Sequence, residues 1–145
     1  MANEAVYKYG TLKTLEASGG STVANAFTQA NDASMTATDH SDYTLLDFVF
    51  SGTFSVAPTA GEVVNVYARL LDIDGTNDSQ VPSANYLATY LGSFLVENVT
   101  SAQYIALYNV PLPGRSFDCY IENKTSQTLS AAWTLKVQPK TVGPY

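Results

Sequence analysis

The sequence predicts an all-β protein: an antiparallel two-sheet β-sandwich with jelly-roll-like connectivity and an extended N-terminal arm. Three observations lead to this prediction: short segments in which apolar and polar residues alternate, turn-forming residues between them, and a length of 145 residues that suits one domain. Successive side chains of a strand point to opposite faces, so each alternating segment has one dry face and one wet face. Several such strands separated by turns are typical of a sandwich.

The clearest strands lie near the C-terminus. Phe117, Cys119 and Ile121 alternate with polar neighbours, and so do Trp133 and Leu135. Earlier segments repeat the pattern, and proline- or glycine-containing turns at residues 57–61 and 111–114 separate some of them. The expected strands are 22–29, 43–54, 62–71, 87–97, 103–110, 115–122 and 130–138.

One segment allows two interpretations. Residues 83–95 alternate poorly, and Leu87, Leu91 and Phe94 also fit a helical stripe with Ser83 as a possible cap. We favour a strand, because Gly92 interrupts the segment and valines follow it.

The first twenty residues are expected to form the N-terminal arm, and residues 21–145 the sandwich domain. The arm contains strand-forming residues without sustained alternation, and Gly19-Gly20-Ser21 would end it with a flexible hinge. Such an arm either frays or lies along a partner. The residues expected to contact partners are Val6, Tyr7, Tyr9 and Leu12 of the arm, with Tyr67 and Tyr120 from the wet faces of two strands.

Composition indicates a chain that packs against neighbours. Charged residues make up 14%, against about 25% in typical domains, and the net charge is −6. A charge-poor surface loses little on burial in an interface, because desolvating a charge costs several kcal/mol. A free, charge-poor β-domain is the alternative.

The seven basic residues are scattered, so we expect no binding to nucleic acid or to an anionic membrane surface. No apolar run reaches the length of a membrane span, and the start has no secretory pattern, so synthesis and folding in the cytoplasm are expected.

The candidate catalytic and metal-binding residues favour no enzyme. His40 has acidic and hydroxyl neighbours, but adjacent residues of an extended chain point apart, so we interpret it as part of a surface loop. Cys119, the single cysteine, is expected in the core as a small hydrophobe. No pair of carboxylates stands out as catalytic, and no cofactor is expected.

Residues 72–78 carry the oxygen ligands of a possible calcium loop. Their spacing departs from the EF-hand pattern, because Gly75 is the fourth residue and the twelfth is Ser83. Asp and Asn are also common in turns, and we favour a turn over a metal site.

Several segments resemble small virion proteins of tailed bacteriophages, most of all the decoration (cement) proteins of the capsid exterior. The resemblance lies in composition and turns over roughly residues 43–140, at APTAGEVV (57–64), LDIDGTND (71–78), YLGSF (90–94), PLP (111–113), YIEN (120–123) and WTLK (133–136). It implies a β-sandwich, no cofactor, and binding to the major capsid protein, usually as an oligomer. No functional residue carries over.

The expected function is therefore that of a non-enzymatic decoration protein that clamps capsomers on the outer head surface, as a homo-oligomer. Two alternatives remain open: a tail, neck or head-fibre component, and a carbohydrate-binding module that uses exposed tyrosines and residues 72–78.

Overall fold

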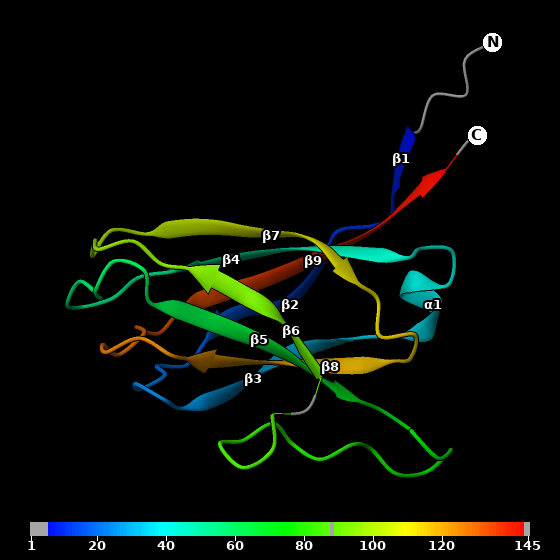
Figure 1. Cartoon of the computed structure of the whole chain (residues 1–145), viewed down its shortest axis with the longest axis horizontal. Coiled ribbons are helices and arrows are strands. Elements are labelled where there is room, and N and C mark those ends of the chain that lie inside the picture. Colours follow the sequence, from blue (N-terminus) through cyan, green and yellow to red (C-terminus); the bar gives the residue numbers. More distant parts are fainter. Residues whose placement is uncertain (1–5, 88, 144–145) are drawn as a thin grey trace.

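The computed structural model describes residues 6–87 and 89–143 and consists of two antiparallel sheets stacked against each other (Figure 1). The predicted all-β class is confirmed. The elements are β1 (Val6–Tyr9), β2 (Lys13–Gly19), β3 (Phe27–Met35), α1 (Ala37–His40), β4 (Leu45–Gly52), β5 (Val63–Leu70), β6 (Thr89–Leu95), β7 (Gln103–Pro111), β8 (Phe117–Asn123) and β9 (Trp133–Gly143).

One sheet has the order β1-β9-β4-β7, with β2 also paired to β9, and the other has the order β3-β8-β5-β6. The strand pairs are nested: β2 pairs with β9, β3 with β8, β4 with β7, and β5 with β6. The chain from β2 to β9 thus runs as one long antiparallel hairpin whose tip is the connection between β5 and β6. In addition, β4 pairs with β9, and β5 pairs with β8. The first of these pairings joins β2, β9, β4 and β7 in one sheet, and the second joins β3, β8, β5 and β6 in the other.

The core lies between the sheets and is formed by the predicted dry faces. Trp133, Leu135 and Val137 of β9 are fully buried, as are Phe48 and Phe50 of β4. Phe50 packs on Phe94 of β6 and on Trp133, with ring centroids 5.3 and 6.4 Å apart. Cys119 is buried as predicted.

The first predicted strand is displaced along the sequence. Residues 22–29 were expected to form it, whereas β3 begins at Phe27 and continues to Met35. Asn25 has a φ of 61°, in the left-handed region, so it interrupts an extended chain. Thr22 instead forms an isolated bridge with Leu129.

Residues 6–19 do not form the separate arm that the sequence suggested. They contain β1 and β2, which both pair with β9, and Leu15 is fully buried in the core. Residues 1–5 of the expected arm lie outside the described residues. β1 nevertheless stands away from the body: Figure 1 shows it projecting beside the C-terminal end of β9.

Residues 89–95 form the strand β6. The favoured strand interpretation is therefore confirmed for residues 89–95, and the helical alternative for this segment is wrong. The helix α1 was not predicted. Thr36 caps it, and the Thr36 backbone N–H donates a hydrogen bond to the Asp39 carboxylate.

Candidate functional site

The outer surface of the five-stranded sheet presents exposed tyrosines among small and apolar side chains. We call this surface the tyrosine face and define it as Val49 and Ser51 of β4, Tyr104, Ala106 and Tyr108 of β7, and Thr134 and Lys136 of β9. Successive side chains of a strand point to opposite faces of the sheet. In β4, β7 and β9 the residues between the members of this face point into the core, so the members themselves point outward.

Strand register places the members of the tyrosine face in rows. Ser51 lies between Tyr104 and Thr134, and its hydroxyl is 2.7 Å from that of Thr134. Tyr104 is 79% exposed and Tyr108 is 65% exposed. Such tyrosines are rigid anchors with large apolar area, and they are common in protein interfaces.

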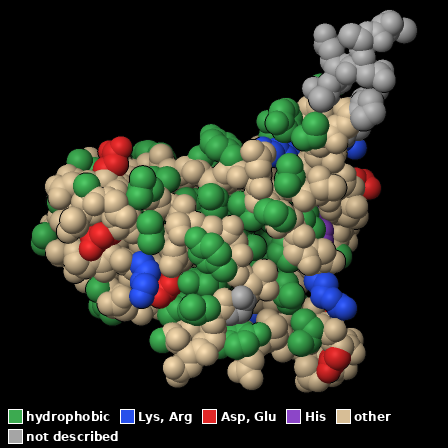
Figure 2. Space-filling view, viewed as in Figure 1, with side chains coloured by type: hydrophobic (Ala, Val, Ile, Leu, Met, Phe, Trp, Pro, Cys, Tyr) green, Lys and Arg blue, Asp and Glu red, His purple; other side chains and the backbone are tan. Residues whose placement is uncertain are grey.

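A groove adjoins this face along β7. It has a volume of about 600 Å³, and its lining includes Tyr104, Tyr108, Leu95 and Val99. In the view of Figure 2, hydrophobic side chains recur over the middle of the molecule, where β6 and β7 lie in Figure 1. The tyrosine face thus continues into a hollow that could receive a protruding segment of another chain.

A buried ion pair connects the tyrosine face to β1. The ammonium of Lys140 lies 2.7 Å from Asp47, and the Lys140 side chain is 5% exposed. The same ammonium lies 5.2 Å from the ring centre of Tyr7 and 5.7 Å from that of Tyr108. Through these cation–π contacts Lys140 of β9 links Tyr7 of β1 with Tyr108 of β7.

The four arm residues that the sequence proposed as contacts are all exposed. Val6, Tyr7, Tyr9 and Leu12 are 48 to 53% exposed, and the rings of Tyr7 and Tyr9 stack with centroids 6.1 Å apart. Val6, Tyr7 and Tyr9 lie on β1, which projects from the molecule, and Leu12 lies between β1 and β2. Contact with a partner remains a prediction.

Tyr67 and Tyr120 were expected to project from wet faces as contact residues, and this expectation of exposure is wrong. Tyr67 is 3% exposed and Tyr120 is 7% exposed. The rings of Phe27 and Tyr90 pack against Tyr67, and the Tyr120 hydroxyl donates to Gln29 at 3.0 Å. Alternation gave the direction of these side chains correctly but not the groups that cover them.

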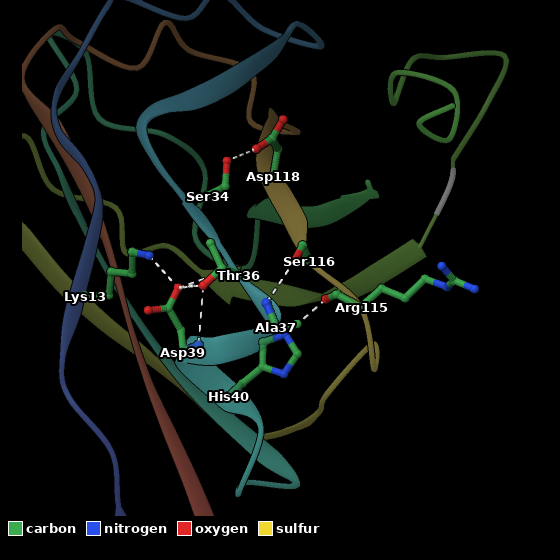
Figure 3. A network of polar contacts seen from close by, with 9 residues as sticks. All are labelled: Lys13, Ser34, Thr36, Ala37, Asp39, His40, Arg115, Ser116 and Asp118. Atoms are coloured by element: carbon green, nitrogen blue, oxygen red, sulfur yellow. Dashed lines mark hydrogen bonds and ion pairs between the residues drawn. The ribbon is translucent and has the colours of Figure 1, made fainter. Parts of the chain in front are cut away.

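His40 belongs to a polar network at the junction of β3, α1 and β8 rather than to a surface loop (Figure 3). Its side chain is buried, its ring packs beside Phe117, and Nε2 lies 3.0 Å from the Arg115 carbonyl oxygen. Because a carbonyl oxygen can only accept a hydrogen bond, the Nε2–H group of His40 is the donor. These contacts hold α1 against β8.

The loop of residues 72–78 forms the predicted turn. One carboxylate oxygen of Asp74 accepts hydrogen bonds from the backbone of Thr76 and Asn77 at 2.9 and 2.7 Å. Hydrogen bonds, first from the Asn77 side chain and then from these amides, lower the pKa of Asp74 to about 2. Gly75 takes the left-handed φ of 93° that the turn requires.

No three His, Cys, Asp or Glu residues within 6–87 and 89–143 are grouped to hold a metal ion. Burial raises the pKa of the Cys119 thiol well above its usual range, and the charge of Asp118 adds to the shift. Across the described residues there is no helix with the length and apolarity of a membrane span.

Comparison of the chain with protein-family models, curated proteins and solved structures finds no match.

Proposed function

We propose that this chain is a non-enzymatic structural protein of a phage virion, and more narrowly a decoration protein. It would bind the major capsid protein on the outer head surface and stabilise the capsid by bridging neighbouring capsomers. The tyrosine face carries the proposal, because it is an exposed, charge-poor surface on a rigid sheet. The resemblance of the sequence to virion proteins supplies the choice of partner.

The projecting end of the molecule supports a second point of contact. A two-stranded ribbon is marginally stable alone in water, and β1 pairs only with the end of β9 among the described strands. A partner that covers Val6, Tyr7 and Tyr9 would stabilise this ribbon. If the projecting end bound one subunit and the tyrosine face another, the chain would bridge the two and gain affinity through avidity.

For the fold, we propose jelly-roll connectivity. A jelly roll has eight strands in two sheets, and nested pairing from β2 to β9 is the pairing expected when one long hairpin is wound into two layers. β1 would be an addition to these eight strands. Viral capsid domains and lectins both use this fold, so it agrees with the proposed function without deciding it.

A co-sedimentation assay with pre-formed empty capsids of the parent phage tests the function. We expect the wild-type chain to sediment with capsids, and the Tyr104→Ser/Tyr108→Ser variant to bind at least about tenfold more weakly, since interface tyrosines often contribute more than 1 kcal/mol each. The matched control is Tyr86→Ser, because Tyr86 is also exposed but lies between β5 and β6, away from the tyrosine face.

The clamping role has a separate test in the virion. Particles stripped of this protein should lose heat resistance, and adding the chain back should restore it. Unchanged heat resistance after stripping would reject clamping. A density map of the whole particle that places the protein in the tail, the neck or a head fibre would favour that alternative instead.

A further inference from the structure

A second hollow lies on the four-stranded sheet, on the opposite side of the molecule from the tyrosine face. Its volume is about 290 Å³. Its lining includes Asn65 and Tyr67 of β5, Glu122 of β8 and Lys124 just after it, Asn25 before β3, and Leu87 of the long connection before β6. Hydrogen-bond donors and acceptors thus line this hollow together with the apolar side chain of Leu87.

Glu122 of β8 is the central group of this hollow. It is 4% exposed, and one oxygen of its carboxylate accepts hydrogen bonds from the Tyr67 hydroxyl at 2.9 Å and the Asn65 amide at 3.0 Å. The other oxygen lies 3.5 Å from the Lys124 ammonium. Burying a carboxylate is costly unless it is hydrogen-bonded and paired, and these three partners meet that condition for Glu122.

The partners of Glu122 are themselves held in place. Burial, and then the hydrogen bond to Glu122, raise the pKa of Tyr67 to about 12, so its hydroxyl remains a donor at neutral pH. The Ser93 hydroxyl donates to the Asn65 carbonyl oxygen at 2.6 Å, which directs the Asn65 amide hydrogens to Glu122. One carboxylate oxygen is therefore fixed by β5, and the other lies near the half-exposed Lys124.

These groups suit a ligand whose polar atoms both donate and accept. A sugar hydroxyl can donate to the Glu122 carboxylate while it accepts from the Lys124 ammonium, and Asn25 supplies an amide that can do either. Leu87, which is 54% exposed, provides an apolar surface for the C–H face of a sugar ring. The adjacent opposite charges of Glu122 and Lys124 disfavour a ligand with a net charge of either sign.

We infer that this hollow binds one neutral sugar residue of a glycan, with a hydroxyl group between Glu122 and Lys124. The inference goes beyond the proposed attachment to a capsid. Because the two sites lie on different sheets, a chain attached through its tyrosine face would leave the sugar site accessible.

Saturation-transfer NMR with the methyl glycosides of glucose, galactose, mannose and N-acetylglucosamine tests the inference. We expect transfer to at least one of them from the wild-type chain. Lys124→Met should weaken that binding about tenfold, since it removes a charged hydrogen-bond donor to the ligand. Leu87→Ala should weaken it by a smaller factor. Glu97→Gln is the control, because Glu97 is an exposed carboxylate outside this hollow.

Glu122→Gln tests the buried carboxylate directly, and it could also disturb folding. Lys124 and Leu87 are exposed, so their variants keep the test valid if that chain fails to fold. Absence of transfer from all four glycosides to the folded wild-type chain would overturn the inference, and so would binding that Lys124→Met and Leu87→Ala leave unchanged. Both of these variants should still sediment with capsids, which separates failure here from failure of the proposed function.

Discussion

At the scale of single residues, the ionised side chains stabilise the places where elements join. Asp39 is an example at the start of α1 (Figure 3). Its carboxylate accepts from the Lys13 ammonium at 2.5 Å and from the backbone and hydroxyl of Thr36, both at 2.7 Å. Burial raises the pKa of Asp39, but these hydrogen bonds outweigh it and bring the pKa to about 2.

This shift predicts a pH dependence of stability. The pKa of Asp39 is lower in the folded chain than the ordinary value of 3.8, so between those two values the unfolded chain binds more protons. The stabilisation is complete above pH 4 and is lost as the pH falls towards 2. The side chain is 32% exposed, so we expect a contribution of only about 1 kcal/mol after allowing for solvent screening.

Urea unfolding of the wild type and Asp39→Asn measures this contribution. The variant should be less stable by about 1 kcal/mol at pH 7, and the difference should shrink towards zero near pH 2. Asp42→Asn, at an exposed position in the same segment, should show no such change. An equal loss at both pH values would mean that Asp39 acts through packing rather than through its charge.

At the scale of elements, the predicted strands are those whose core-facing residues alternate regularly. In β4 and β9, large apolar side chains point to one face and the sequence pattern shows it. β2 and β3 lack this signal because polar groups join them: the Asn31 backbone N–H donates to the Glu16 carboxylate at 3.1 Å, and the Ala17 backbone N–H donates to the Asp32 carboxylate at 2.6 Å. No local pattern reveals that two carboxylates serve the backbone of a neighbouring strand.

Gly19 and Gly20, at the end of β2, do not act as the flexible hinge that the sequence suggested. A Cβ on Gly19 would lie 2.0 Å from the indole of Trp133, so the glycine allows β2 to approach β9. The Trp133 indole N–H then donates to the Gly20 carbonyl at 2.8 Å. Both glycines therefore belong to the packing of the first sheet.

Substitution of the two glycines distinguishes close packing from flexibility. Gly19→Ala should destabilise the fold by about 1 to 3 kcal/mol, because the added methyl group collides with a fully buried ring. Gly20→Ala should change stability by less than about 1 kcal/mol, since its added methyl group would meet nothing within 4 Å. Urea midpoints with unchanged slopes measure both effects, and equal effects of the two substitutions would contradict the packing explanation.

At the scale of the whole molecule, the alternation of apolar and polar residues predicts the fold class and the side of the sheet to which each side chain points. It does not predict which segments cover that side of the sheet. Tyr67 points away from the core as predicted, yet Phe27 and Tyr90 cover it, and the chain before β6 supplies Leu87 beside it. Tyr104 and Tyr108 have the same residue type on an outward face and stay exposed. Their exposure depends on how distant segments fold across each sheet, which alternation does not encode.

The distribution of charge over the molecule leads to a prediction about how it binds. The net charge is −6, but the tyrosine face as defined includes one charged side chain, Lys136, and Asp47 and Lys140 beside it form an ion pair with each other. Binding through this face should therefore depend mainly on burial of apolar area, which salt screens little.

Capsid binding measured at several salt concentrations tests which surface is used. We expect the affinity to change by less than about threefold between roughly 50 and 500 mM NaCl, because screening acts on exposed charges and few lie on this face. A steep loss of affinity with salt would instead indicate contact through exposed charged side chains elsewhere on the molecule, such as Asp72 and Asp74. In that case the Tyr104→Ser/Tyr108→Ser variant should bind like the wild type. The proposal that the tyrosine face contacts the capsid would then be wrong.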